Sequence, residues 1–285
     1  TDTPLDPSEQ ELRILNGTVP KMAMGLAWDL AGFTVHDLNQ QWAWGFFDPQ
    51  GNWSEWTWNH MFGHVPSDEL LRAGRASSAV LLALSAAALL VITRWIVPAR
   101  WAAWLATGLY VTQPGVLLNG RRSMMEGAML LGMTLAILAA LGLLRAQARP
   151  QSSNRARWAW AAALGVAAGF ALSCKHTALI TVAIAFGIVF VEPLVRRGGA
   201  GARFHFAHLA RLVVAGALAI AVFLALNPAW WPDPLNMPGR VLDARTRLIE
   251  GQRAGYGGYN TWGEQVRGLA NQAFFAGNQY YEVAA

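Results

Sequence analysis

The sequence predicts an all-α, polytopic transmembrane protein of the kind that carries interfacial helices in large loops on one side of the membrane. Three observations predict this class. Charged residues make up only 14% of the 285 residues, whereas a soluble domain carries about 25%. Long apolar runs alternate with short Arg-rich connections. Six of the 14 tryptophans lie in residues 1–75, and Trp favours the membrane–water interface.

The same composition excludes other classes. An apolar content of 54% is too high for a disordered chain, and a single cysteine cannot build a disulfide scaffold. A net charge of +5 and a pI near 9.9 would suit nucleic acid only if the basic residues gathered on one soluble face. They lie between apolar runs instead, so the expected partner is a lipid bilayer and no nucleic acid.

Residues 1–75 are too polar to span a membrane, and we expect them to form a first outer loop with short amphipathic helices on the membrane surface. The sequence starts without Met or a signal peptide and stops without a closing pattern. We therefore expect an internal segment of a longer chain, which lacks at least one helix upstream and several downstream.

Apolar runs long enough to cross the membrane follow. A spanning helix needs about 20 such residues. The run 158–191 has 34 residues, which would make a helix of about 51 Å, so it must tilt steeply or break. A break is expected at the polar cluster inside the run, Ser173-Cys174-Lys175-His176-Thr177. The predicted transmembrane domain is 76–228, with six spans: 76–97, 101–118, 125–144, 158–174, 177–195 and 209–228.

Orientation follows from the arginines. The connections 94–100, 145–157 and 192–211 hold ten arginines and one acidic residue. Short loops rich in Lys and Arg stay cytoplasmic, which puts residues 1–75 and 229–285 outside. The latter form a second outer loop, cut short, with helical stretches near 239–253 and 261–275.

Several charges are not explained by this orientation. Both lysines of the chain, Lys21 and Lys175, and the pair Arg121 and Arg122 stand on the outer side next to apolar segments, with Glu126 opening the following span. Such charges mark functional sites, with an anion such as a lipid phosphate as the ligand. The alternative is a set of snorkelling or ion-paired surface residues.

The first loop supplies carboxylates. Asp2, Asp6, Glu9 and Glu11 precede the first apolar stretch, and one of them could act as general base on an acceptor hydroxyl. A solvated acidic loop is the alternative. His60 and His64 have metal-ligand spacing, but no third ligand is fixed and the Glu of a zinc-protease motif is missing, so we expect no metal or cofactor.

Five short motifs occur in a characteristic order. They are the acidic loop leading into NGTVPK, the turn RRSMMEG, the break SCKHT, the exit Asn227-Pro228-Ala229-Trp230-Trp231-Pro232, and an outer loop that ends with Phe274-Phe275 and Tyr280-Tyr281-Glu282. This order resembles the lipid-carrier-dependent glycosyltransferases of the GT-C fold. The nearest resemblance is to the protein O-mannosyltransferase-like family and its bacterial relatives, including the aminoarabinose transferases.

The resemblance implies an enzyme of a bacterial inner membrane. It would move a mannose-like hexose or a related sugar from a polyprenyl phosphate to a hydroxyl of a protein, lipid or glycan on the outer face. The catalytic candidates are Asp6, Glu9 and Glu11, although the Asp-Glu pair of the family is absent. The implied substrate-binding residues are Lys21, Arg121, Arg122, Glu126, Lys175 and His176.

Two other classes stay open on the sequence alone. A transporter or lipid flippase also has broken helices and intramembrane charges, but here the charges lie on one side and no inverted repeat is visible. A non-catalytic membrane scaffold is the third class.

Overall fold

The computed structural model describes residues 14–39, 54–113, 115–117, 126–196, 206–256, 258 and 261–274. Throughout these ranges the regular structure is helical, without a strand. Five helical segments in the described ranges are long and apolar enough to cross a membrane: Asp68–Ile96, Glu126–Ala148, Asn154–Cys174, His176–Pro193 and Phe206–Leu226. The predicted class, an all-α polytopic membrane protein, is confirmed.

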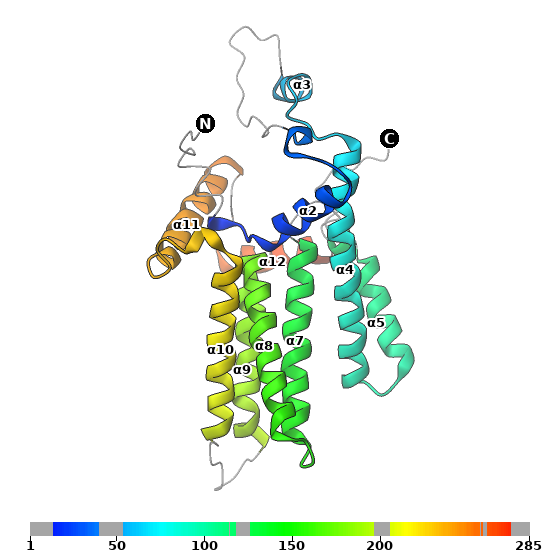
Figure 1. The fold of residues 1–285 in the computed structure, drawn as a ribbon, viewed down its shortest axis with the longest axis vertical. Coiled ribbons are helices and arrows are strands. Elements are labelled where there is room, and N and C mark those ends of the chain that lie inside the picture. Colours follow the sequence, from blue (N-terminus) through cyan, green and yellow to red (C-terminus); the bar gives the residue numbers. More distant parts are fainter. Residues whose placement is uncertain are drawn as a thin grey trace.

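The spanning helices form a bundle (Figure 1). Helix α7 (Glu126–Ala148) packs against α8 (Asn154–Cys174), against α4 (Asp68–Ile96) and against α9 (Leu179–Arg196), while α10 (Phe206–Leu226) packs on the other side of α8. α7 and α8 are therefore the centre of the domain.

Helix α5 (Arg100–Thr112) differs from its predicted range of 101–118. It packs against α4 but has 13 residues, which give a length of about 20 Å and not the roughly 30 Å of a bilayer core. The last hydrogen bond of the helix is donated by the Gln113 N–H to the Leu109 carbonyl. Pro114 lies outside the described residues.

Caps move two helix starts away from the ends of the apolar runs. Ser67 accepts a hydrogen bond from the Leu70 N–H, with Asp68 and Glu69 in the first turn, so α4 begins eight residues before the predicted span at 76. Ser153 accepts from the Ala156 N–H and starts α8 at Asn154 instead of 158.

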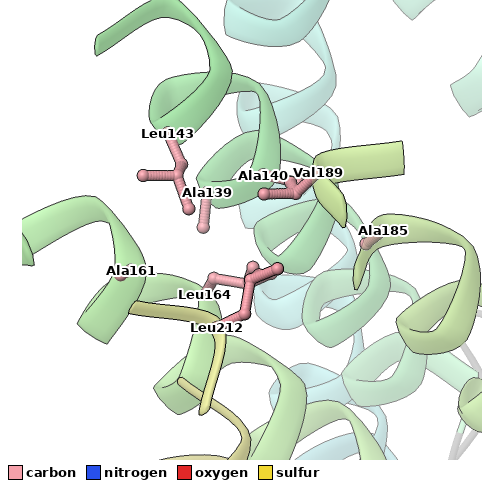
Figure 2. Close-up of a cluster of buried hydrophobic side chains, with 8 residues drawn as sticks. All are labelled: Ala139, Ala140, Leu143, Ala161, Leu164, Ala185, Val189 and Leu212. Atoms are coloured by element: carbon pink, nitrogen blue, oxygen red, sulfur yellow. The ribbon is translucent and has the colours of Figure 1, made fainter. Parts of the chain in front are cut away.

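The core between the spans is built from small residues. One buried cluster combines four alanines with four larger aliphatic residues, one from each of α7, α8, α9 and α10. Figure 2 shows its members: Ala139, Ala140, Leu143, Ala161, Leu164, Ala185, Val189 and Leu212. Alanine and glycine let helix backbones approach closely, which is how helices associate where lipid removes the hydrophobic drive.

The two ends of the bundle carry different elements. Figure 1 puts α2 (Val19–Leu30), α3 (Glu55–Met61), α11 (Met237–Tyr256) and α12 (Trp262–Phe274) at one end, together with the start of α7 and the end of α8. The α4–α5 and α7–α8 connections lie at the opposite end. The described helices of the segments predicted to lie outside are thus separated from these two Arg-rich connections, and which end faces the cytoplasm stays a prediction.

Short helices cover the first of these ends. α2 packs against α4, where the Trp28 indole N–H donates to the Leu70 carbonyl at 2.9 Å. α11 buries Met237, Val241 and Ala244 against Ile14 and Leu15. Residues far apart in the chain therefore meet over the end of the bundle.

Candidate functional site

The long apolar run breaks at Lys175. α8 ends at Cys174, Lys175 is extended (φ −163°, ψ 133°), and a 3₁₀ turn η2 (His176–Ala178) leads into α9 at Leu179. The Lys175 N–H still closes α8 on the Ala171 carbonyl at 3.2 Å. The break therefore falls within the SCKHT cluster and puts a lysine side chain at the end of the central helix.

Lys175 forms an ion pair with Glu126. Its Nζ lies 2.7 Å from Oε1 of Glu126, with the two side chains 23% and 17% exposed. Glu126 stands in the first turn of α7, where the helix dipole favours a carboxylate. Oε2 of Glu126 is buried and has no hydrogen-bond partner among the described residues. An ammonium has three donors, so an ammonium held by one carboxylate oxygen still has donors for an anion.

His176 forms an aromatic wall next to this pair. Its ring lies 6.1 Å from that of Phe223 on α10 and 5.7 Å from that of Trp230 in the turn η3 (Pro228–Trp230), measured between centroids. Its Nδ1 is buried without a hydrogen-bond partner in the described part of the chain. The exit from α10 thus closes one side of the site.

Asn227 ties three distant segments together and is 2% exposed. Its Nδ2 donates to Oγ of Ser173 at 2.8 Å and to the Phe223 carbonyl at 2.7 Å, while its Oδ1 accepts from Thr18 at 3.1 Å. Asn227 belongs to the exit motif read from the sequence, but its role as a link, with Thr18 and Ser173, was missed. An amide at the end of an apolar run, followed by proline, was the available signal.

Gly17 brings the first loop onto the same helix end. A Cβ at this position would collide with the backbone carbonyls of Ser173 and Cys174. Only glycine fits such a backbone approach. The chain just before α2 is consequently held against the break that carries Lys175.

The structure brings together some of the predicted residues. Glu126 and Lys175 are in contact, His176 follows Lys175, and Lys21 is exposed in the first turn of α2 at the same end of the bundle (Figure 1). The remaining candidates lie outside the described residues and stay predictions: Asp6, Glu9, Glu11, Arg121 and Arg122.

The histidine pair of the first loop has local partners. Nδ1 of His60 lies 2.8 Å from the Trp56 carbonyl oxygen, and its ring lies 4.0 Å from the Trp56 ring. The described residues supply no third metal ligand to His60 and His64.

A comparison with protein families identifies a match over residues 37–230, to the model of dolichyl-phosphate-mannose-protein mannosyltransferase. A comparison with curated proteins finds no match. The matched range covers more than half of the chain, from the first loop to η3, and includes both Glu126 and Lys175. Of the glycosyltransferase, the transporter or flippase and the non-catalytic scaffold that the sequence left open, the family match supports the glycosyltransferase, an enzyme. The chain belongs to the dolichyl-phosphate-mannose-protein mannosyltransferase family of glycosyltransferases.

Proposed function

We propose that this protein transfers a mannose-like hexose or a related sugar from a polyprenyl phosphate to an acceptor hydroxyl on the outer face of a bacterial inner membrane. Lys175, positioned by Glu126, holds the lipid phosphate. The observation that carries the proposal is the ion pair of 2.7 Å at the break between α8 and α9. The family supports a mannosyltransferase-type reaction with a lipid-linked donor.

The depth of the pair suits this donor. Glu126 opens the spanning helix α7 and Lys175 follows the last residue of α8. The ends of spanning helices lie near the headgroup level, where the phosphate of a polyprenyl carrier also lies. Ionisable side chains that border the hydrocarbon core are costly and therefore mark functional sites.

The reaction needs positive charge at the leaving group. The acceptor oxygen attacks the anomeric carbon, the bond from that carbon to the phosphate oxygen breaks, and the phosphate leaves with the electron pair. Its charge grows as the bond breaks, and a positioned ammonium stabilises this growth. Glu126 fixes the direction of the Lys175 ammonium, and the Lys21 ammonium and the Arg121 and Arg122 guanidinium groups are proposed to complete the phosphate site.

A carboxylate must take the proton of the acceptor. The candidates are Asp6, Glu9 and Glu11, since the described start of the chain at Ile14 and Leu15 packs over the same end of the bundle. The base would stand on the face of the anomeric carbon opposite the phosphate, so the displacement inverts the configuration at that carbon. Protein, lipid and glycan hydroxyls are all acceptors of suitable chemistry.

The test is an in vitro transfer assay of the full-length protein against a panel of polyprenyl-phosphate sugars. We expect Lys175→Ala and Arg122→Ala to lower kcat by about 100-fold or more, because each removes charge that the transition state needs. Lys175→Arg keeps a positive charge and should retain part of the activity. Arg240→Ala removes an exposed arginine of α11 and is the matched control. Normal transfer by both Lys175→Ala and Arg122→Ala would refute the phosphate site.

The base is tested separately with Asp6→Asn, Glu9→Gln and Glu11→Gln. The variant that lacks the base should retain donor binding and lose transfer. If all three variants transfer sugar normally, the base lies in another part of the protein, while the assignment of the phosphate site is unaffected.

A further inference from the structure

A polar cavity lies at the end of the bundle opposite the Lys175 site. Its volume is about 430 Å³, and it lies where α4 ends, α7 ends and α8 begins. Its polar and aromatic lining consists of Trp95, Arg145, Arg149, Ser152 and Trp160. None of these residues contributes to the Lys175 site.

The length of α7 fixes the depth of this cavity. Glu126 and Arg145 lie on the same helix, 19 residues apart, which corresponds to about 28 Å. The hydrocarbon core of a bilayer is about 30 Å thick. If Glu126 lies at one headgroup level, Arg145 lies at the other, and Trp95 and Trp160 are the aromatic residues expected at that interface.

The charges of the cavity favour an anion. The Arg145 guanidinium lies 5.2 Å from the centroid of the Trp95 ring and donates from Nη1 to the Trp95 carbonyl at 2.8 Å. Arg149 is exposed. The described residues that line the cavity include these two arginines and no carboxylate, so an incoming phosphate meets positive charge alone.

Carbonyl groups at the end of α7 would repel an anion, but Arg157 covers them. Its Nε donates to the Ala146 carbonyl at 3.2 Å and its Nη2 to the Arg149 carbonyl at 3.4 Å. The negative end of the helix dipole is thereby offset on the side where α8 begins.

The aromatic walls are held in place. The Trp95 and Trp160 rings meet edge to face with centroids 5.7 Å apart. Trp160 also packs so closely on α7 that a Cβ at Gly142 would collide with its ring. The cavity therefore has a fixed apolar side next to its charged side, which suits an amphiphile with a phosphate headgroup.

We infer that this cavity binds a phosphate-bearing anion at the headgroup level opposite the catalytic face, with an anionic phospholipid as the expected source. Basic pockets between transmembrane helices bind anionic headgroups in this way. An arginine can bind a phosphate with two parallel hydrogen bonds, and both Arg145 and Arg149 line the cavity. This site is separate from the sugar donor and does not rest on the proposed function.

The test uses the full-length protein in nanodiscs of phosphatidylcholine, with and without phosphatidylglycerol, and counts retained lipids by native mass spectrometry. Arg149→Gln should weaken retention of phosphatidylglycerol by about fivefold, the effect of one charge at the surface. Arg155→Gln is the matched control, because Arg155 is exposed near the start of α8 and does not line the cavity. Ala156→Leu fills the cavity without changing any charge and should also reduce retention.

A second arm distinguishes the sources. Millimolar inorganic phosphate is added to the detergent-solubilised protein, with and without phosphatidylglycerol. The site is assigned to a phospholipid if retention of phosphatidylglycerol requires Arg149 and is not reduced by inorganic phosphate. Binding of inorganic phosphate that depends on Arg149 assigns it to a soluble phosphate. Equal losses for Arg149→Gln and Arg155→Gln, or no loss for Arg149→Gln in either arm, would overturn the proposal.

Discussion

Asn227 holds the proposed site together although it carries no charge. Its amide bonds to Ser173 on α8, to the Phe223 carbonyl on α10 and to Thr18 before α2. When a buried amide is removed, its partners are left buried without hydrogen bonds. This costs more free energy than the hydrogen bonds themselves contribute. We assign Asn227 a positioning role for Lys175, two residues after Ser173.

Replacing Asn227 should loosen this end of the protein. Asn227→Ala removes hydrogen bonds to three segments, and we expect a loss of about 2 kcal/mol, or a Tm lower by about 5 °C. A thiol-reactive dye can report unfolding, because Cys174 is the single cysteine of the sequence and is fully buried. Asn236→Ala, at an exposed asparagine that bonds to Asp233, is the control and should leave Tm within about 1 °C. An unchanged Tm for Asn227→Ala would contradict the positioning role.

The charged residues Lys175 and Glu126 could be found from the sequence, whereas the contacts among Thr18, Ser173 and Asn227 could not. Lys175 and Glu126 stand out in the sequence because charged residues next to apolar segments are costly and therefore rare. Thr18, Ser173 and Asn227 are ordinary polar residues, and a separation of 209 residues between Thr18 and Asn227 hides their contact. The roles of Asp6, Glu9 and Glu11 stay predictions.

At the scale of elements, α8 depends on glycines where it crosses α10. A Cβ at Gly165 would lie 2.5 Å from the Ala215 carbonyl oxygen, and one at Gly169 would lie 2.5 Å from that of Ala219. Gly165 and Gly169 are four residues apart, as are Ala215 and Ala219, so each glycine of α8 meets one alanine of α10. The helices can approach this closely only because no side chain intervenes.

An added methyl group at this contact should therefore destabilise the bundle. We expect Gly169→Ala to lower the free energy of unfolding by about 1–3 kcal/mol, as overpacking of a filled core does. Gly216→Ala is the control on α10, because a Cβ there meets no atom within 4 Å. It should not lower stability, since alanine favours a helix over glycine by about 1 kcal/mol. The same dye assay at Cys174 measures both, and equal shifts would argue against close packing at Gly169.

The sequence predicts which segments form spanning helices, but it predicts only some of the residues at which these helices begin and end. Hydropathy locates apolar runs but ignores caps, so α4 and α8 start earlier than 76 and 158, at Asp68 and Asn154. The break at Lys175 was predictable because one helix through the whole run is too long for a bilayer. The end of α5 had a signal that the predicted range 101–118 ignored, because Gln113-Pro114-Gly115 follows Thr112 and the residue before a proline is disfavoured in a helix.

At the scale of the whole molecule, the separation of charge gives the protein its predicted orientation. The Arg-rich α4–α5 and α7–α8 connections lie at the end opposite α2 and α11 (Figure 1). Arginines in short loops are retained on the cytoplasmic side, so the Lys175 site should face outward.

Cysteine labelling tests this orientation. In a Cys174→Ala background, Leu235→Cys should react with a membrane-impermeant maleimide in intact cells. Leu235 is 89% exposed and lies just before α11, which is at the predicted outer end. Arg155→Cys, exposed at the opposite end, should react only after the membrane is permeabilised. The reverse pattern would invert the topology and move the proposed transfer to the cytoplasmic face.

The contact of Gly17 with the carbonyls of Ser173 and Cys174 has a mechanical consequence. With no space for even a methyl group between the two backbones, the segment before α2 cannot move toward the end of α8 without displacing it. Under the proposed function, an acceptor that pushed this segment toward α8 would therefore also displace Lys175, which follows Cys174. Acceptor binding and binding of the donor phosphate would then be coupled through this backbone contact, in addition to the hydrogen bonds that join Thr18, Asn227 and Ser173.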